Sequence, residues 1–217
     1  RNSASPQALE QTLHSLSALA PEFAPRRIFV LDAAEPCETD ATLPQLQHVV
    51  PDDGDDPFAT FNRLAGECGC DWLLSIDAGD RFTASGLSMV AVEMLRVPGL
   101  RALCADEMMR GDDGNLSALL RPDFNLDLLL SMPSGTARHW LFRREAFLEA
   151  GGFDPAFADA PELDLLLRIV DGTDVAALDR AGQVRLRRDV VAFAFQTFGL
   201  VPVLSALLRN TDIAPRT

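Results

Sequence analysis

The chain has 217 residues, of which 47% are hydrophobic and 24% charged, and its formal net charge is −13. This length and composition fit one globular domain with a substantial core. The acidic balance argues against nucleic-acid binding and against general attraction to an anionic membrane, because both need an excess of basic side chains. The four cysteines lack metal-ligand spacing, which is typical of reduced thiols in a cytoplasmic protein.

The first half of the chain is predicted to alternate helices and strands. Pro6 stands in a first helical turn, and leucines at helical spacing predict a helix that ends before Pro21. The apolar run 28–31 predicts a buried strand that ends at Asp32. A short strand over 46–50 and an acidic turn follow, and then a helix from 58 to about 66.

A second buried strand ends in a pair of acids. Residues 72–76 are mostly apolar, and Asp77 and Asp80 follow on a tight loop. Two carboxylates at the carboxyl end of a strand can hold a divalent cation through oxygen, at the edge of an open α/β sheet where ligands bind. Alternatively, Asp80 caps the helix that starts near Thr83, which would leave one acid for a metal.

The second half begins with a helix over 87–95, a strand over 100–105 and a hairpin turn at 110–115. A strand then feeds a helix within 140–150. Gly151 and Gly152 end that helix where positive φ is needed, so that Phe153 can fold back onto the sheet.

The run 190–208 contains no charged residue. Polar residues, a glycine and a proline interrupt it, so a membrane span is the least favoured interpretation. We expect a kinked helix packed on the domain or forming a homodimer contact, in preference to a peripheral membrane helix. The expected organisation is therefore a main domain over 1–180 and a helical extension over 181–217.

Four segments together resemble one enzyme family. The segments are IDAGD at 76–80, LRPDFNLDLL at 120–129, WLFRREAFLEAGGFD at 140–154 and PELDLLLR at 161–168. They are similar to the DxD turn, the P-D-[FW]-x-x-D-L-L stretch, the G-G-F-D run and the E-D-x-D-L-x-x-R helix start of family 2 glycosyltransferases. Those of the bacterial O-antigen and rhamnan type are the most similar. The resemblance covers roughly residues 1–170 and implies an α/β, GT-A-like fold with an open, mostly parallel sheet.

The resemblance also implies an inverting transfer. The donor is a nucleotide sugar, and the acceptor is a saccharide or lipid-linked molecule of cell-surface polysaccharide synthesis. Asp77 and Asp80 would hold Mn²⁺ or Mg²⁺ beside the diphosphate. Glu162 stands at the position of the general base, and Asp164 takes an orienting or capping role with base as the fallback. Such an enzyme would work in the cytoplasm, either free or peripheral to the inner membrane.

Two further residues match donor-binding positions of the family. Asp32, at the end of the first strand, would bond the nucleotide base, although it could equally cap the loop. Asn62 lies where the family carries an Arg-Asn pair near the donor, with Phe61 in place of the arginine. His139 is either an acceptor or phosphate contact or a structural residue.

Several departures keep a second hypothesis open. The family usually begins with another buried strand, which this sequence lacks. Gly79 stands where a metal ligand is expected, and Glu162 replaces an aspartate. The alternative is therefore a non-catalytic GT-A domain that binds a sugar nucleotide or a partner protein. A receiver-like module is a more distant alternative, without a suitable Asp and Lys pair to support it.

Overall fold

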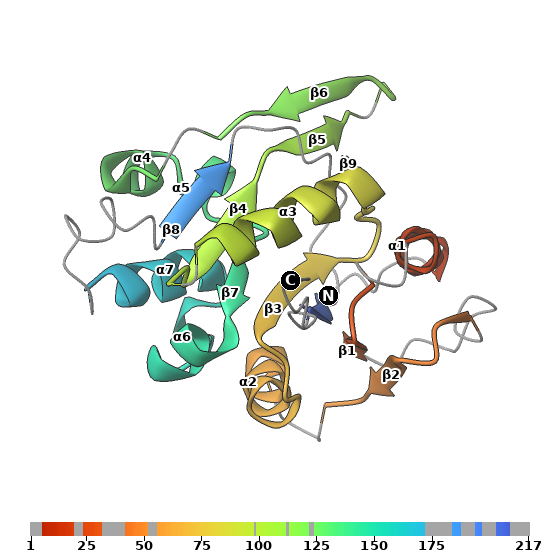
Figure 1. The fold of residues 1–217 in the computed structure, drawn as a ribbon, viewed down its shortest axis with the longest axis horizontal. Helices are drawn as coiled ribbons and strands as arrows, with labels where there is room; N and C mark the ends of the chain where they lie inside the picture. The colour runs from red at the N-terminus through yellow and green to blue at the C-terminus, as the bar shows by residue number, and fades with distance from the viewer. Residues whose placement is uncertain are drawn as a thin grey trace, which may run out of the picture.

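The computed structural model describes residues 6–19, 24–31, 42–51, 56–97, 99–111, 113–121, 124–171, 184–187, 194–196 and 203–208. These residues form layers of helices on both faces of a central sheet (Figure 1). The helices are α1 (Pro6–Ser17), α2 (Pro57–Glu67), α3 (Ala84–Arg96), α4 (Leu126–Ser131), α5 (Pro133–Thr136), α6 (Arg144–Glu149), the 3-10 turn η2 (Pro155–Phe157) and α7 (Pro161–Asp171). The strands are β1 (Arg27–Leu31), β2 (Leu46–Val49), β3 (Trp72–Asp77), β4 (Ala102–Ala105), β5 (Glu107–Arg110), β6 (Leu116–Leu119), β7 (Leu141–Arg143), β8 (Val184–Arg187), β9 (Ala194–Gln196) and β10 (Val203–Leu208).

The main sheet has the strand order β2-β1-β10-β3-β7-β4-β8. Its pairings make β1, β2, β3, β4 and β8 point one way, with β7 and β10 reversed. A smaller sheet, in the order β6-β5-β9, continues from β4. The α/β class with a mostly parallel sheet is therefore as expected, and the hairpin predicted at 110–115 joins β5 to β6.

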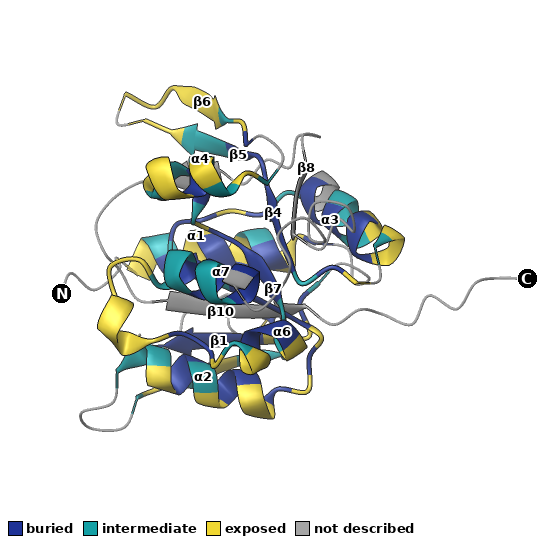
Figure 2. Cartoon of the chain, turned by 90° about the vertical axis from the view of Figure 1, so that its left-hand side faces the viewer, coloured by how far each residue is buried: buried dark blue, intermediate teal, exposed yellow. Residues whose placement is uncertain are grey.

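Side chains alternate between the two faces of the sheet and fill two cores. Leu9, Leu13 and Leu16 of α1 pack with α3 against one face. On the other face, α2, α6 and α7 bury their apolar sides, and Figure 2 shows their buried stripes turned toward the strands. The strand β3 is buried on both faces, as its nearly continuous apolar run predicts.

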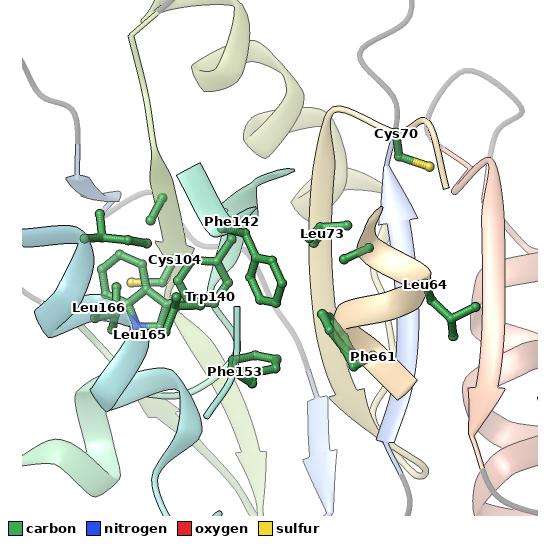
Figure 3. Close-up of a cluster of buried hydrophobic side chains, with 14 of the residues drawn as sticks. Phe61, Leu64, Cys70, Leu73, Cys104, Trp140, Phe142, Phe153, Leu165 and Leu166 are labelled. Atoms are coloured by element: carbon green, nitrogen blue, oxygen red, sulfur yellow. The ribbon is translucent and has the colours of Figure 1, made fainter. Parts of the chain in front are cut away.

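Phe153 is the centre of the second core (Figure 3). Its ring meets Phe147 and Phe142 edge to face and lies 4.9 Å from the ring centroid of Phe61. Gly151 and Gly152 have φ of 86° and 73°, so the chain reverses after α6 and returns Phe153 to the sheet. The predicted role of these two glycines is confirmed.

The helix expected over 190–208 is wrong for the residues that the structure describes there. Residues 194–196 form β9 and residues 203–208 form β10, while 184–187, also within the expected helical extension, form β8. The strand β10 lies between β1 and β3 and pairs with both. Each of those strands presents a row of backbone donors and acceptors, which an uncharged apolar segment satisfies better as a strand than as a surface helix.

Among the described helices, none is both long and apolar enough to cross a bilayer. The expected homodimer or membrane contact of 190–208 stays a prediction, because much of that run lies outside the described residues.

Candidate active site

Helix α1 holds the loop that follows β3. The hydroxyl of Thr12, buried on α1, accepts the backbone N–H of Gly79 at 2.8 Å, and Ser15 accepts the N–H of Phe82 at 3.1 Å. Gly79 has φ of 110°, a conformation that favours glycine. The glycine that replaces an expected acid is therefore required by this turn.

The two predicted metal ligands lie on this loop. The Asp80 carboxylate accepts the backbone N–H of Asp77 at 2.9 Å, which folds the second acid back toward the first. Thr83, and not Asp80, caps α3, because its hydroxyl accepts the N–H of Gly86. The alternative role of Asp80 as a helix cap is thus wrong, and both acids face the same end of β3.

His139 joins the acids from a distant part of the sequence. Its Nε2 lies 3.5 Å from Oδ2 of Asp80. One ligand atom from each of Asp77, Asp80 and His139 falls within 4.8 Å of the other two. Two carboxylates and an imidazole suit a divalent transition metal such as Mn²⁺, so these residues fit the metal that the sequence predicts. The exposed guanidinium of Arg138 lies 3.8 Å from Asp77 and brings a positive charge to the same place.

Burial and neighbouring charges shift the pKa values of His139 and Asp77. Burial pulls the pKa of His139 down, but bonds to Asp80 and Glu107 outweigh burial and raise it to about 9. Burial and the neighbouring Asp80 raise the pKa of Asp77, against the opposing effect of His139 and Arg138. Without a metal, a protonated His139 therefore supplies the positive charge that balances the acids.

Behind His139 lies a buried ion pair that sequence reasoning missed. Oε1 of Glu107 is 3.1 Å from Nδ1 of His139 and also pairs with the guanidinium of Arg121. Arg121 donates to the backbone carbonyls of Ala105 and Gly135, and its own N–H bonds to Asp106. A signal was present, because Glu107 follows the buried strand β4 much as Asp80 follows β3.

Glu162 reaches the same group from α7. Its carboxylate, only 8% exposed, accepts the backbone N–H of Trp140 at 3.1 Å. Trp140 directly follows His139. Asp80, after β3, and Glu162, on α7, therefore contact two consecutive residues. Burial raises the pKa of Glu162 to about 7, although His139, the Trp140 N–H and Arg121 oppose this shift. A carboxyl group with that pKa is suited to general-base chemistry near neutral pH.

Of the remaining predicted residues, Asn62 and Asp164 do not join this group. Both polar atoms of the Asn62 amide bond to the backbone of Phe153, at 2.8 and 2.9 Å. Asp164 pairs with Arg168, which donates to the carbonyls of Ala150 and Gly152. Asp32 lies outside the described residues. The donor contact of Asn62 and the catalytic fallback of Asp164 stay predictions, and the roles visible in the structure are structural.

No protein-family model matches this sequence. The chain is 34% identical over 123 residues to the O-antigen biosynthesis protein RfbC of Myxococcus xanthus, a match that covers 56% of this chain and 9% of that protein. The chain therefore spans less than a tenth of the length of this curated relative.

Solved structures resemble the fold over most of the chain. S. aureus TarS 1–349 superposes with a TM-score of 0.65 at 11% identity, covering 90% of this chain and 58% of that chain. Its complex with UDP-GlcNAc gives a TM-score of 0.66 at 10% identity, over 90% and 56% of the two chains. The mannosyltransferase PcManGT from Pyrobaculum calidifontis, in complex with GDP-Man and Mn²⁺, gives 0.50 at 15% identity, over 86% and 55%.

These likenesses agree with the motifs that the sequence carries. They confirm the resemblance to GT-A glycosyltransferases, and the described residues have that fold.

Proposed function

We propose that this chain is a GT-A domain of an inverting glycosyltransferase. It would move a sugar from a nucleotide-sugar donor to a saccharide or lipid-linked acceptor in cell-surface polysaccharide synthesis. The likeness to an O-antigen biosynthesis protein supports the pathway class, and the UDP-GlcNAc and GDP-Man bound to two structural neighbours support the donor class.

One observation carries the proposal: Asp77, Asp80 and His139 converge, and Glu162 lies one peptide away through the N–H of Trp140. Metal-assisted transfer of a sugar needs a cation site for the donor diphosphate and a carboxylate for the acceptor hydroxyl. Residues from the end of β3, from α7 and from the segment before β7 would supply both in one group.

Asp77, Asp80 and His139 would hold Mn²⁺ or Mg²⁺. When bound, the ion supplies positive charge that stabilises the departing nucleoside diphosphate. Arg138, exposed beside Asp77, would add a positive charge for the diphosphate.

Glu162 takes the proton of the acceptor hydroxyl. The acceptor oxygen then forms a bond to the anomeric carbon while the bond from that carbon to the donor phosphate oxygen breaks. Attack and departure on opposite faces invert the anomeric configuration. Glu162 must be ionised to act, so its raised pKa places the active form at and above neutral pH.

Titration calorimetry with UDP and GDP tests the donor site. Mn²⁺ should strengthen binding of the nucleoside diphosphate, and Asp77→Ala should remove that gain, because a ligand of the cation is lost. Glu149→Gln, an exposed glutamate paired with Arg101, is the control and should bind as the wild type does.

Equal nucleotide binding with and without Mn²⁺ would contradict the cation site. Nucleotide binding that depends on Mn²⁺, but with no donor turnover in the presence of a broad acceptor panel, would favour the non-catalytic GT-A domain instead. The departures at Gly79 and Glu162 are the sequence features that support this second candidate.

A further inference from the structure

We propose that Glu107, held by Arg121, is a positioning residue for His139. It fixes the imidazole with Nε2 toward Asp80 and thereby raises the affinity of Asp77, Asp80 and His139 for a divalent cation. This inference rests on the cation site of the proposed function and assigns two residues that the sequence motifs leave without a role.

The two ring nitrogens of His139 face different carboxylates. Glu107 lies 3.1 Å from Nδ1 of His139, and an ionised carboxylate can only accept a hydrogen bond. Nδ1 therefore carries a hydrogen, and Nε2 is the nitrogen that faces Asp80 at 3.5 Å. A ligating histidine needs this arrangement, with one nitrogen anchored to a carboxylate and the other directed at the metal.

Arg121 holds the Glu107 carboxylate in place through a buried ion pair. Both side chains are almost fully buried, at 1% and 4% exposed, so an unpaired charge on either would be strongly unfavourable. The guanidinium is itself fixed, because it donates to the carbonyl of Ala105 at 2.8 Å and to that of Gly135 at 3.2 Å. The carboxylate that meets His139 is thus anchored to the backbone at the end of β4 and at α5.

The backbone at His139 also marks a constrained position. Its φ is 55°, and His139 is the one non-glycine residue with positive φ in the described parts of the chain. Such a conformation is unfavourable for a residue with a side chain and persists where surrounding contacts hold it. Trp140 supplies that hold, because its indole N–H bonds to Thr136 at 2.7 Å and its backbone N–H bonds to Glu162.

The charges of the group agree with a divalent ion. Glu107 and Arg121 cancel each other, and a neutral His139 adds no charge. The carboxylates of Asp77 and Asp80 then face the cation position, with the exposed guanidinium of Arg138 beside Asp77.

Mn²⁺ titration of the full 217-residue chain tests the proposal. Affinity is measured by calorimetry and by the electron paramagnetic resonance of free Mn²⁺, and circular dichroism confirms that each variant is folded. We expect Glu107→Gln to weaken Mn²⁺ binding by about 10–100-fold, the usual effect of losing the carboxylate behind a ligating histidine. Glu93→Gln, a buried glutamate paired with Arg96 near the far end of α3, should leave the affinity unchanged.

Glu107→Asp provides a second variant if Glu107→Gln does not fold. It keeps the charge opposite Arg121 but draws the carboxylate away from Nδ1 by one methylene, so the same loss of affinity is expected. In the His139→Ala background, substitution of Glu107 should cause no further loss, because the residue acts through the imidazole.

Two results would overturn the inference: unchanged Mn²⁺ affinity in a folded Glu107 variant, or an equal loss with and without His139. If the wild type binds Mn²⁺, neither result contradicts the cation site of the proposed function. A wild type that binds no Mn²⁺ would refute that site and the inference together.

Discussion

Two groups of polar side chains, one around His139 and one around the turn that follows α6, are bonded in different ways. In the first, Asp80, Glu107 and His139 contact one another through their side chains. In the second, Asn62 bonds to the backbone of Phe153, and Arg168, which also pairs with Asp164, donates to the carbonyl of Gly152. The first group brings ionisable side chains together, whereas the second holds a turn of the main chain in place.

The difference separates residues that can serve a ligand from residues that serve the fold. The Asn62 amide uses both of its polar atoms to hold the backbone of Phe153. The carboxylates beside a protonated His139 can instead exchange the imidazole proton for a cation. All the residues concerned are polar, and all are at least partly buried. Their bonding partners, and not their residue types, indicate their roles.

The largest effect should come from Glu162→Gln. Glutamine keeps an oxygen for the N–H of Trp140 but cannot take a proton, so donor turnover should fall by about 10²–10⁴-fold while nucleotide affinity is kept. Release of nucleoside diphosphate measures the turnover. Asp164→Asn is the competing variant, and turnover lost there but retained in Glu162→Gln would make Asp164 the base.

The second prediction concerns stability against pH. The pKa of Glu162 rises from 4.5 to about 7 on folding, so between these values the unfolded chain has released the proton that the folded chain keeps. This contribution is fully present below pH 4.5 and is lost as pH rises to about 7, at about 1.4 kcal/mol per pH unit. Urea unfolding across this range should show the decline in the wild type and a weaker one in Glu162→Gln. Parallel curves would mean that Glu162 titrates normally.

Asn62→Ala tests the second group. The substitution leaves the N–H and carbonyl of Phe153 without partners, so the free energy of unfolding should fall by about 1–3 kcal/mol. The affinity of the folded Asn62→Ala variant for the nucleotide should not change. A loss of affinity without a loss of stability would instead restore the donor contact predicted from the family resemblance.

The smallest effect is the difference between two neighbouring alanine substitutions. Both Gly151→Ala and Gly152→Ala place a side chain at positive φ, which costs about 1 kcal/mol. Only at Gly152 would the new Cβ lie 2.5 Å from Oδ1 of Asn62, whereas at Gly151 its nearest neighbour is 3.7 Å away. Gly152→Ala should therefore be about 1 kcal/mol less stable than Gly151→Ala in thermal unfolding. Equal stabilities would show that the Asn62 amide can move aside.

Local patterns determined much of this protein. Leucines at helical spacing predict α1, an apolar run predicts β3 and its acids, and the glycine pair predicts the turn after α6, because each signal lies within a few residues. The same apolar run predicts that Asp77 and Asp80 lie at the carboxyl end of a buried strand.

Only the tertiary structure decided which distant side chains meet. His139 and Glu107 are 32 residues apart, and Asn62 and Phe153 are 91 apart, so their contacts depend on how strands and turns pack rather than on any local pattern. The strands near the carboxyl end are a second case, because pairing with β1 and β3 gives 203–208 a partner that its own sequence does not reveal. A sequence specifies the bonding capacity of each residue, and packing specifies the partner that satisfies it.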